Sequence, residues 1–288
     1  MIYLNGAEFR AHPQKRVLLF GMSGLGKTHL ATMLRDTGRW FHYSVDYRIG
    51  TRYMGEYIAD NFKREAMKIP LLRELLMTDS VYIASNITFD NLAPLSTYLG
   101  KPGDPARGGL PIGEYQRRQG QHRDAEIAAL LDTTRFSDRA KGIYGYDNFV
   151  CDTSGSICEV LNAEDPADPV MQELSRHLLF VWIKGSDAHK AELCRRFDRA
   201  PKPMYYRPDM LTALWAEFTD RKSPDQIDPD AFLRFGFARL LEQRQPRYEA
   251  MARWGVTVTA EEVATVRDPA GFDDLIAAAL DRSSETRS

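Results

Sequence analysis

The sequence has few cysteines and no long hydrophobic run. Its 288 residues include three cysteines, Cys151, Cys158 and Cys194. Because their number is odd and their spacing is not that of metal ligands, the sequence predicts neither a disulfide framework nor a zinc site. No apolar segment is long enough to span a bilayer, and residues 1–15 lack the apolar core of a signal peptide. We therefore expect a cytoplasmic protein in a reducing compartment, with no membrane partner.

The sequence also lacks an excess of charge of one sign. The 38 Lys and Arg residues and 40 Asp and Glu residues give a formal net charge of −2. This balance argues against a nucleic-acid partner, which favours a basic surface. The six histidines show no spacing typical of a metal site or of a nucleophile–base pair. A chain of this length suits one α/β domain with insertions.

One motif points directly to a function. Residues 21–28 follow the apolar run 17–20, precede a helical pattern, and match the P-loop. Glycines let loop amides point at phosphate oxygens, and the helix that follows adds its positive dipole end. Lys27 would neutralise the β- and γ-phosphates, and Thr28 would hold Mg²⁺. The predicted nucleotide-binding residues are Gly21, Met22, Ser23, Gly24, Leu25, Gly26, Lys27, Thr28 and His29. The motif does not distinguish ATP from GTP.

The elements around the P-loop indicate an α/β protein. Apolar runs typical of strands alternate with helical patterns, which predicts a parallel sheet with helices on both faces. Asn5-Gly6 predicts a short N-terminal hairpin. We expect a single domain over residues 1–280, with a helical insert at about 53–146, a lid region at about 195–230 and a disordered tail at 281–288. The run 80–84 fits either a strand or a buried helix. The predicted strands are 17–20, 40–45, 148–152, 178–183 and 256–258.

Two aspartates follow predicted strands at the edge of the sheet where ligands bind. Asp46 comes after the second strand and is a candidate for positioning the phosphoryl acceptor; the alternative is an Asp that caps a turn. Asp152 ends an apolar strand in the manner of a Walker B carboxylate. We predict that Asp152 contributes to Mg²⁺ binding rather than capping the next helix. Ser156 and Glu159 have the spacing of a capping box.

Several cations are candidates for binding anionic groups. Arg48 and Arg52 follow Asp46 and would suit an anionic substrate; the alternative is a pair of surface arginines. Arg135 and Arg139 precede the Asp152 strand and are equally open to both interpretations. The basic stretch from Arg107 to Arg123 fits a solvated loop better than a flap over the ligand. The candidates for cations on a closing lid are Arg196, Arg199 and Arg207.

Three segments of the chain resemble the P-loop small-molecule kinases of the shikimate kinase and gluconate kinase type, within the nucleoside monophosphate kinase-like group. Residues 21–28 match the family's P-loop. Residues 181–186 and the helix around 192–196 resemble its lid-preceding strand and helix. Residues 240–252, followed by 256–258, are similar to the R-x-P-x-Y-x-x-x-A helix and last strand of shikimate kinases.

The resemblance implies a five-stranded parallel core, ATP and Mg²⁺, a closing lid, and phosphoryl transfer to a hydroxyl of a small polar metabolite. It implies that Asp46 binds the acceptor. It also implies that Ser154 and Gly155 stand where shikimate kinases carry a triple-glycine substrate loop. The sequence departs from the family at that triple glycine and at the Asp-x-Asp pair, which is Asp46-Tyr47-Arg48 here.

We therefore expect an ATP-dependent phosphotransferase with catalytic residues Lys27, Asp46 and Asp152. Its acceptor would be a hydroxyl or phosphate of a small, anionic metabolite. The alternative is a regulatory ATPase or nucleotide-sensing switch whose insert at about 53–146 binds a protein partner. The sequence does not identify the acceptor or the oligomeric state.

Overall fold

The computed structural model describes residues 1–220, 222–223 and 226–287. These residues form two compact units. Unit 1 consists of residues 1–45, 130–200 and 236 onward, and unit 2 consists of residues 46–129 and 201–235. The sequence predicts one domain with two insertions. In the structure, the residues of those insertions form most of a second compact unit.

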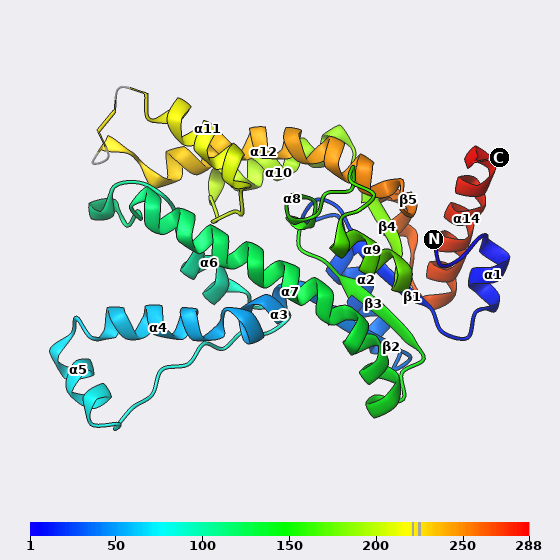
Figure 1. The fold of residues 1–288 in the computed structure, drawn as a ribbon, viewed down its shortest axis with the longest axis horizontal. Helices are drawn as coiled ribbons and strands as arrows, with labels where there is room; N and C mark the ends of the chain where they lie inside the picture. The colour runs from blue at the N-terminus through cyan, green and yellow to red at the C-terminus, as the bar shows by residue number, and fades with distance from the viewer. Residues whose placement is uncertain (221, 224–225, 288) are drawn as a thin grey trace. The chain divides into compact units, whose positions relative to one another are not determined.

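The core of unit 1 is a five-stranded sheet in which every pair of neighbouring strands is parallel (Figure 1). The strand order is β2-β3-β1-β4-β5, so the predicted P-loop NTPase fold is confirmed. Most strand residues are buried because helices cover both faces of the sheet. The strand bounds are β1 (Arg16–Phe20), β2 (Trp40–Ser44), β3 (Asn148–Asp152), β4 (Leu179–Lys184) and β5 (Val256–Thr259).

Aromatic contacts show which helices cover which face of the sheet. Successive residues of a strand point to opposite faces. Trp40 lies 5.5 Å from Phe272 of α14, whereas its neighbour Phe41 lies 6.3 Å from Phe136 of α7 (ring centroids). α14 and the unit 1 part of α7 therefore pack on opposite faces. The helices of unit 1, or with a part in it, are α1 (Gly6–Ala11), α2 (Lys27–Asp36), α7 (Ile112–Tyr144), α8 (Ile157–Val160), α9 (Pro169–His177), α10 (Asp187–Arg199), α12 (Pro229–Ala252), α13 (Ala260–Thr265) and α14 (Pro269–Arg287).

The N-terminus is a helix, so the predicted hairpin is wrong. An Asn-Gly hairpin turn needs positive φ at both residues. Asn5 instead has extended backbone, and its side chain accepts a hydrogen bond from the amide of Glu8, which makes it the N-cap of α1. Gly6 allows close packing on α14, because a Cβ there would lie 2.6 Å from the carbonyl oxygen of Ala277.

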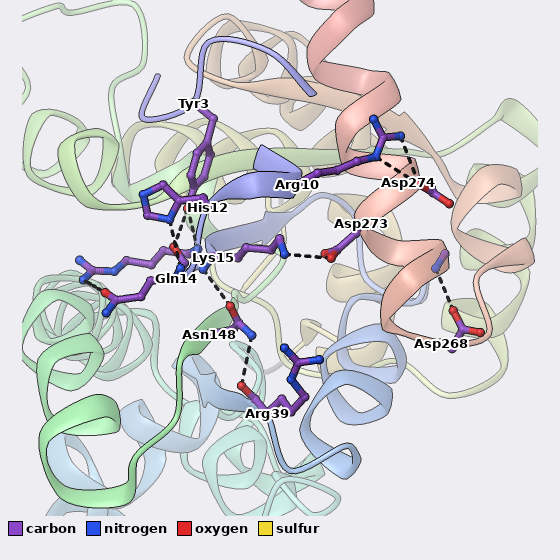
Figure 2. A network of polar contacts seen from close by, with 12 residues as sticks. Tyr3, Arg10, His12, Gln14, Lys15, Arg39, Asn148, Asp268, Asp273 and Asp274 are labelled. Carbon is purple, nitrogen blue, oxygen red and sulfur yellow. Dashed lines mark hydrogen bonds and ion pairs between the residues drawn. The ribbon is translucent and has the colours of Figure 1, made fainter. Parts of the chain in front are cut away.

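Polar contacts secure this N-terminal segment (Figure 2). The ammonium of Lys15 lies 2.9 Å from a carboxylate oxygen of Asp273, and Arg10 pairs with Asp274. The backbone amide of Lys15 donates to the side chain of Asn148, at the start of β3. The start of the chain is therefore attached both to α14 and to the sheet.

The predicted disordered tail is also wrong over residues 281–287, because α14 continues to Arg287. The carboxylate of Asp281 accepts a hydrogen bond of 2.8 Å from the amide of Gly6. This contact between residues far apart in the sequence holds the start of the helical turn. The polar sequence of the segment gives no sign of the contact. Ser288 lies outside the described residues.

Unit 2 has its own core, in which the ring of Phe232 packs against the rings of Tyr206, Trp215 and Phe218. The run 80–84 is neither strand nor buried helix; it is irregular, and Tyr82 is 88% exposed. Apart from its shares of α7 and α12, its elements are α3 (Val45–Arg48, whose first residue belongs to unit 1), η1 (Ile49–Tyr53), α4 (Gly55–Ala66), α5 (Pro70–Met77), α6 (Ala93–Leu99), η2 (Pro105–Arg107) and α11 (Pro208–Phe218).

The basic stretch from Arg107 to Arg123 is not a solvated loop. Most of it belongs to α7, where Arg118 and His122 are buried. Arg118 donates hydrogen bonds to the carbonyl of Tyr98 and to the side chain of Asn61. These long-range partners explain why a basic sequence becomes part of a core. Throughout the described part of the chain, every helix is too short or too polar to cross a bilayer.

Candidate nucleotide-binding site

Three glycines of the loop between β1 and α2 have positive φ, as a P-loop requires. Gly21, Gly24 and Gly26 have φ of 137°, 80° and 94°, a region that favours glycine. At Gly21 the space is also limiting, because a Cβ would lie 2.5 Å from the carbonyl oxygen of Ile183 in β4. Backbone conformation therefore favours glycine at all three positions, and close packing against the neighbouring strand adds a second requirement at Gly21.

Lys27 is the first residue of α2, and its side chain folds back over the loop. The residue is only 6% exposed, and its ammonium donates to the carbonyls of Gly21 at 2.9 Å and Met22 at 3.0 Å. Thr28 and His29 follow on the exposed side of the helix N-terminus. The positive charge is thus held at the centre of the loop, where the first amides of a helix favour an anion.

Asp152 meets Thr28 at the carboxyl end of β3. The hydroxyl of Thr28 donates a hydrogen bond of 2.6 Å to Oδ2 of Asp152, which is 5% exposed. The other oxygen, Oδ1, is buried and has no hydrogen-bond partner in the described part of the chain. A hydroxyl beside a carboxylate with an unused oxygen fits Mg²⁺, which prefers oxygen ligands and takes most of them from water and phosphates. Among the described residues, no group of three or more His, Cys, Asp or Glu side chains is arranged to hold a metal ion.

His42 is a neighbour of Asp152 that the sequence interpretation missed. Its side chain is fully buried, and its Nε2 lies 3.7 Å from Oδ2 of Asp152. His42 lies on β2 opposite Val150 of β3, two residues before Asp152, so both side chains point to the same face of the sheet. Only the strand register reveals this, and one sequence does not give the register.

The loop after β3 packs directly on the P-loop. A Cβ at Gly155 would lie 2.9 Å from the hydroxyl oxygen of Ser23. The hydroxyl of Tyr248, on α12, donates a hydrogen bond of 2.6 Å to the carbonyl of Gly155. The predicted substrate loop, with Ser154 buried beside Gly155, therefore lies beside the nucleotide loop.

These contacts join the P-loop, its lysine and a strand-end carboxylate on a parallel five-stranded sheet. The chain has a P-loop NTPase fold. No family model matches the sequence, and no curated protein matches it. Among solved structures, the chain is similar to shikimate kinase from Bacteroides thetaiotaomicron, with 16% identity and a TM-score of 0.37 over 95% of this chain and 98% of that one.

Behind the loop at 154–156 lies a buried ion pair that corrects the predicted capping box. The side chain of Glu159 does not cap Ser156; it lies 3.2 Å from the guanidinium of Arg244, and both residues are buried. One Arg244 nitrogen lies 3.7 Å from where a Cβ of Gly155 would be. Removing Arg244 would take away the cation that pairs with the buried carboxylate of Glu159, and breaking a buried ion pair in this way is strongly destabilising.

A buried thiol, that of Cys158, lies beside this ion pair. Burial raises the pKa of Cys158 to about 12. Because the thiolate is the nucleophile, this shift disfavours nucleophilic chemistry at Cys158.

The candidates for acceptor binding lie just beyond unit 1. Asp46 is the second residue of α3 and follows directly on Val45, the last residue of that part of unit 1. The guanidinium of Arg48 lies 5.6 Å from the ring centroid of Tyr53, and Arg52 is exposed. All three candidates belong to unit 2, and their role in binding an acceptor stays a prediction.

The remaining predicted cations lie on helix surfaces. Arg135 and Arg139 are exposed on α7, and Arg139 lies over the ring of Phe136 at 5.3 Å. Within unit 1, Arg196 pairs with Glu192 on α10, and Arg199 is exposed at the end of that helix.

In unit 2, Arg207 precedes α11 and pairs with Asp209 at 2.7 Å. These surface pairs do not by themselves indicate substrate binding. The lid and substrate roles of all these cations stay predictions.

Proposed function

We propose that the protein is an ATP-dependent phosphotransferase that transfers the γ-phosphoryl group to a hydroxyl or phosphate of a small polar, anionic metabolite. The contact between Thr28 and Asp152 carries the proposal. It brings the Mg²⁺-binding hydroxyl of a P-loop together with a strand-end carboxylate, although the two residues are 124 positions apart. Phosphoryl transfer from a Mg²⁺–nucleotide requires a hydroxyl and a carboxylate of this kind beside a P-loop lysine.

The residues of the site divide the work. The loop amides and Lys27 bind the β- and γ-phosphates, and the helix N-terminus favours their charge. Thr28 and Asp152 would hold Mg²⁺, which when bound neutralises charge on the transferred group. We assign to Asp46 the orientation of the acceptor hydroxyl and the removal of its proton. Arg48 or Arg52 would hold an anionic group of the acceptor, with Ser154 and Gly155 nearest to the P-loop.

A second candidate function has an observation of its own in its favour. Helix α5 has no buried residue. Large apolar side chains are exposed on it and near it, with Leu71 64%, Met77 72% and Tyr82 88% exposed. Adjacent exposed apolar side chains often mark a protein-binding surface. A nucleotide-dependent switch that binds a protein through this part of unit 2 would also need the P-loop, but it would not need a small-molecule acceptor.

The deciding experiment measures ADP release from ATP with and without pools of anionic metabolites. The variants are Lys27→Ala and Asp46→Asn, with Asp60→Asn, an exposed position on α4, as the matched control. We expect one pool to stimulate turnover. Lys27→Ala should lower all turnover by about 10²-fold or more. Asp46→Asn should remove the stimulation while ATP still binds, and Asp60→Asn should match the wild type.

One result would contradict the phosphotransferase, and another would contradict the role of Asp46 in it. One is the absence of stimulation by any pool, together with a change in partner binding when ATP is added. The other is stimulation that survives Asp46→Asn unchanged. The first result would favour the nucleotide-dependent switch, and the second would remove Asp46 from the acceptor site.

A further inference from the structure

Unit 2 contains a pocket of about 990 Å³, and every residue that lines it belongs to this unit. This volume is at the upper end of the range of small-molecule sites. Segments that are distant in the sequence meet there: the start of α6 with the residues before it, the loop after α6, the Pro201–Pro203 segment and the start of α12. The P-loop contributes no residue to this pocket.

One wall is the loop of residues 101–110, which is firmly folded although its sequence is rich in Gly and Pro. The amide of Gly103 donates to the carbonyl of Leu110, and the amide of Leu110 donates to the carbonyl of Lys101. The glycines allow close packing, because a Cβ at Gly109 would lie 2.5 Å from the carbonyl carbon of Gly103. The amide of Asp104 donates to the carbonyl of Ile227 at 2.9 Å. The loop is therefore fixed against the segment that leads into α12.

The start of α12 also lines the pocket, and two ion pairs connect it to the loop. Arg107 pairs with Asp228 at 2.7 Å, and Lys101 pairs with Asp230. Asp228 also caps α12, since it accepts from the amides of Asp230 and Ala231. The hydrogen bond from the Ala231 amide, with that from Asp230 and the charge of Arg107, lowers the pKa of the Asp228 carboxyl. Two cationic side chains are thereby held in place at the pocket.

The lining carries an excess of positive charge. Lys202 is exposed at the pocket and has no ion pair in the described part of the chain. Asn91, Ser96 and Thr97 add neutral polar groups, and Phe89 with the prolines adds apolar surface. The charged lining residues are four cations, Lys101, Arg107, Lys202 and Arg234, and three acids, Asp90, Asp228 and Asp230.

From this lining we infer that unit 2 carries a second ligand site, which binds a small organic oxyanion. The cations recognise the carboxylate or phosphate group, and the neutral polar side chains recognise hydroxyl groups on the body of the ligand. The site is distinct from the P-loop and does not depend on the phosphotransferase proposal. It gives a function to the loop at 101–110 and to the segment 201–203, both of which line the pocket.

Isothermal titration calorimetry with two probes tests the inference. Citrate supplies carboxylates, and ribose 5-phosphate supplies a phosphate ester. We expect at least one probe to bind the full chain with the same Kd in the wild type and in Lys27→Ala, which impairs the P-loop. Lys202→Glu should weaken binding by about tenfold or more, since it reverses a charge of the lining. Arg64→Glu, the same charge reversal at an exposed position on α4 of the same unit, should leave Kd unchanged.

A second variant blocks the pocket without changing its charge. Thr97→Trp, at an exposed lining position on α6, should abolish binding while thermal unfolding stays like that of the wild type. Three results would overturn the inference: no binding of either probe at millimolar concentration, loss of binding in Lys27→Ala, or equal weakening by Lys202→Glu and Arg64→Glu. The last would mean that the probes respond only to overall charge.

Discussion

Asp152 is the residue on which the proposed nucleotide site depends most, because of its carboxylate. Replacing it with Asn keeps the shape and an oxygen acceptor for Thr28, but removes the negative charge that favours Mg²⁺. We expect Asp152→Asn to raise the Mg²⁺ concentration for half-maximal turnover by about 10–100-fold. Titrating Mg²⁺ at saturating ATP measures this. Asp147→Asn, an exposed position shortly before β3, is the matched control, and an unchanged Mg²⁺ dependence in Asp152→Asn would contradict the assignment.

Much of this site could be predicted from the sequence because its signals are local. The P-loop is a contiguous motif, and Asp152 ends a run of apolar residues. The contacts of His42 and of the Arg244–Glu159 pair could not be predicted from the sequence, for a physical reason. His42 meets Asp152 only through the register of β2 on β3, and Arg244 meets Glu159 across 85 residues of chain. Glu159 shows the resulting error, since its capping-box spacing is local but its partner is not.

Whole elements show the same contrast between local and distant determinants. Asp168 caps α9 and the Thr259–Glu262 pair caps α13, and such caps are local because a cap needs only its own helix. Asn5-Gly6 is equally local but compatible with two structures. The packing of Gly6 against α14, at the other end of the chain, selects the helix over the hairpin.

Helix α7 carries an acid-sensitive interaction near its N-terminus. Hydrogen bonding to Arg117, together with the charge of Arg118, holds the pKa of Glu114 at about 2, against about 4.3 in an unfolded chain. Because the carboxyl pKa is lower in the folded chain than in the unfolded chain, the ionised carboxylate stabilises the fold above a pH of about 4.3. This stabilisation is lost as the pH falls toward 2. We therefore expect Glu114→Gln to be less stable than the wild type near pH 6.

The difference in the free energy of unfolding between the wild type and Glu114→Gln should become smaller as the pH falls. Urea unfolding between pH 6 and pH 3.5 measures this difference in the free energy of unfolding. Glu74→Gln, at an exposed position on α5, should show no such difference. A difference for Glu114→Gln that stays constant over this range would show that the ionised carboxylate is not the stabilising form.

At the scale of the whole molecule, the main surprise is the second unit. Sequence patterns predict the helices between β2 and β3, but not that residues 201–235, far along the chain, belong with them. That association depends on packing between distant segments, such as the fixing of the 101–110 loop by Ile227. A pattern within one segment therefore indicates an insertion, whereas the structure shows a unit with its own core and its own pocket.

The separate cores lead to a prediction that matched substitutions can test. Phe180 is fully buried in β4 of unit 1, and Phe232 is fully buried in the aromatic core of unit 2. Each Phe→Ala change should cost about 3–5 kcal/mol in the unit that contains it. We expect Phe232→Ala to speed hydrogen exchange mainly in residues 46–129 and 201–235 and to keep ATP binding. Phe180→Ala should instead speed exchange in the sheet and weaken ATP binding, because β4 supports the P-loop at Gly21. Equal loss of ATP binding in both variants would mean that the two units unfold as one.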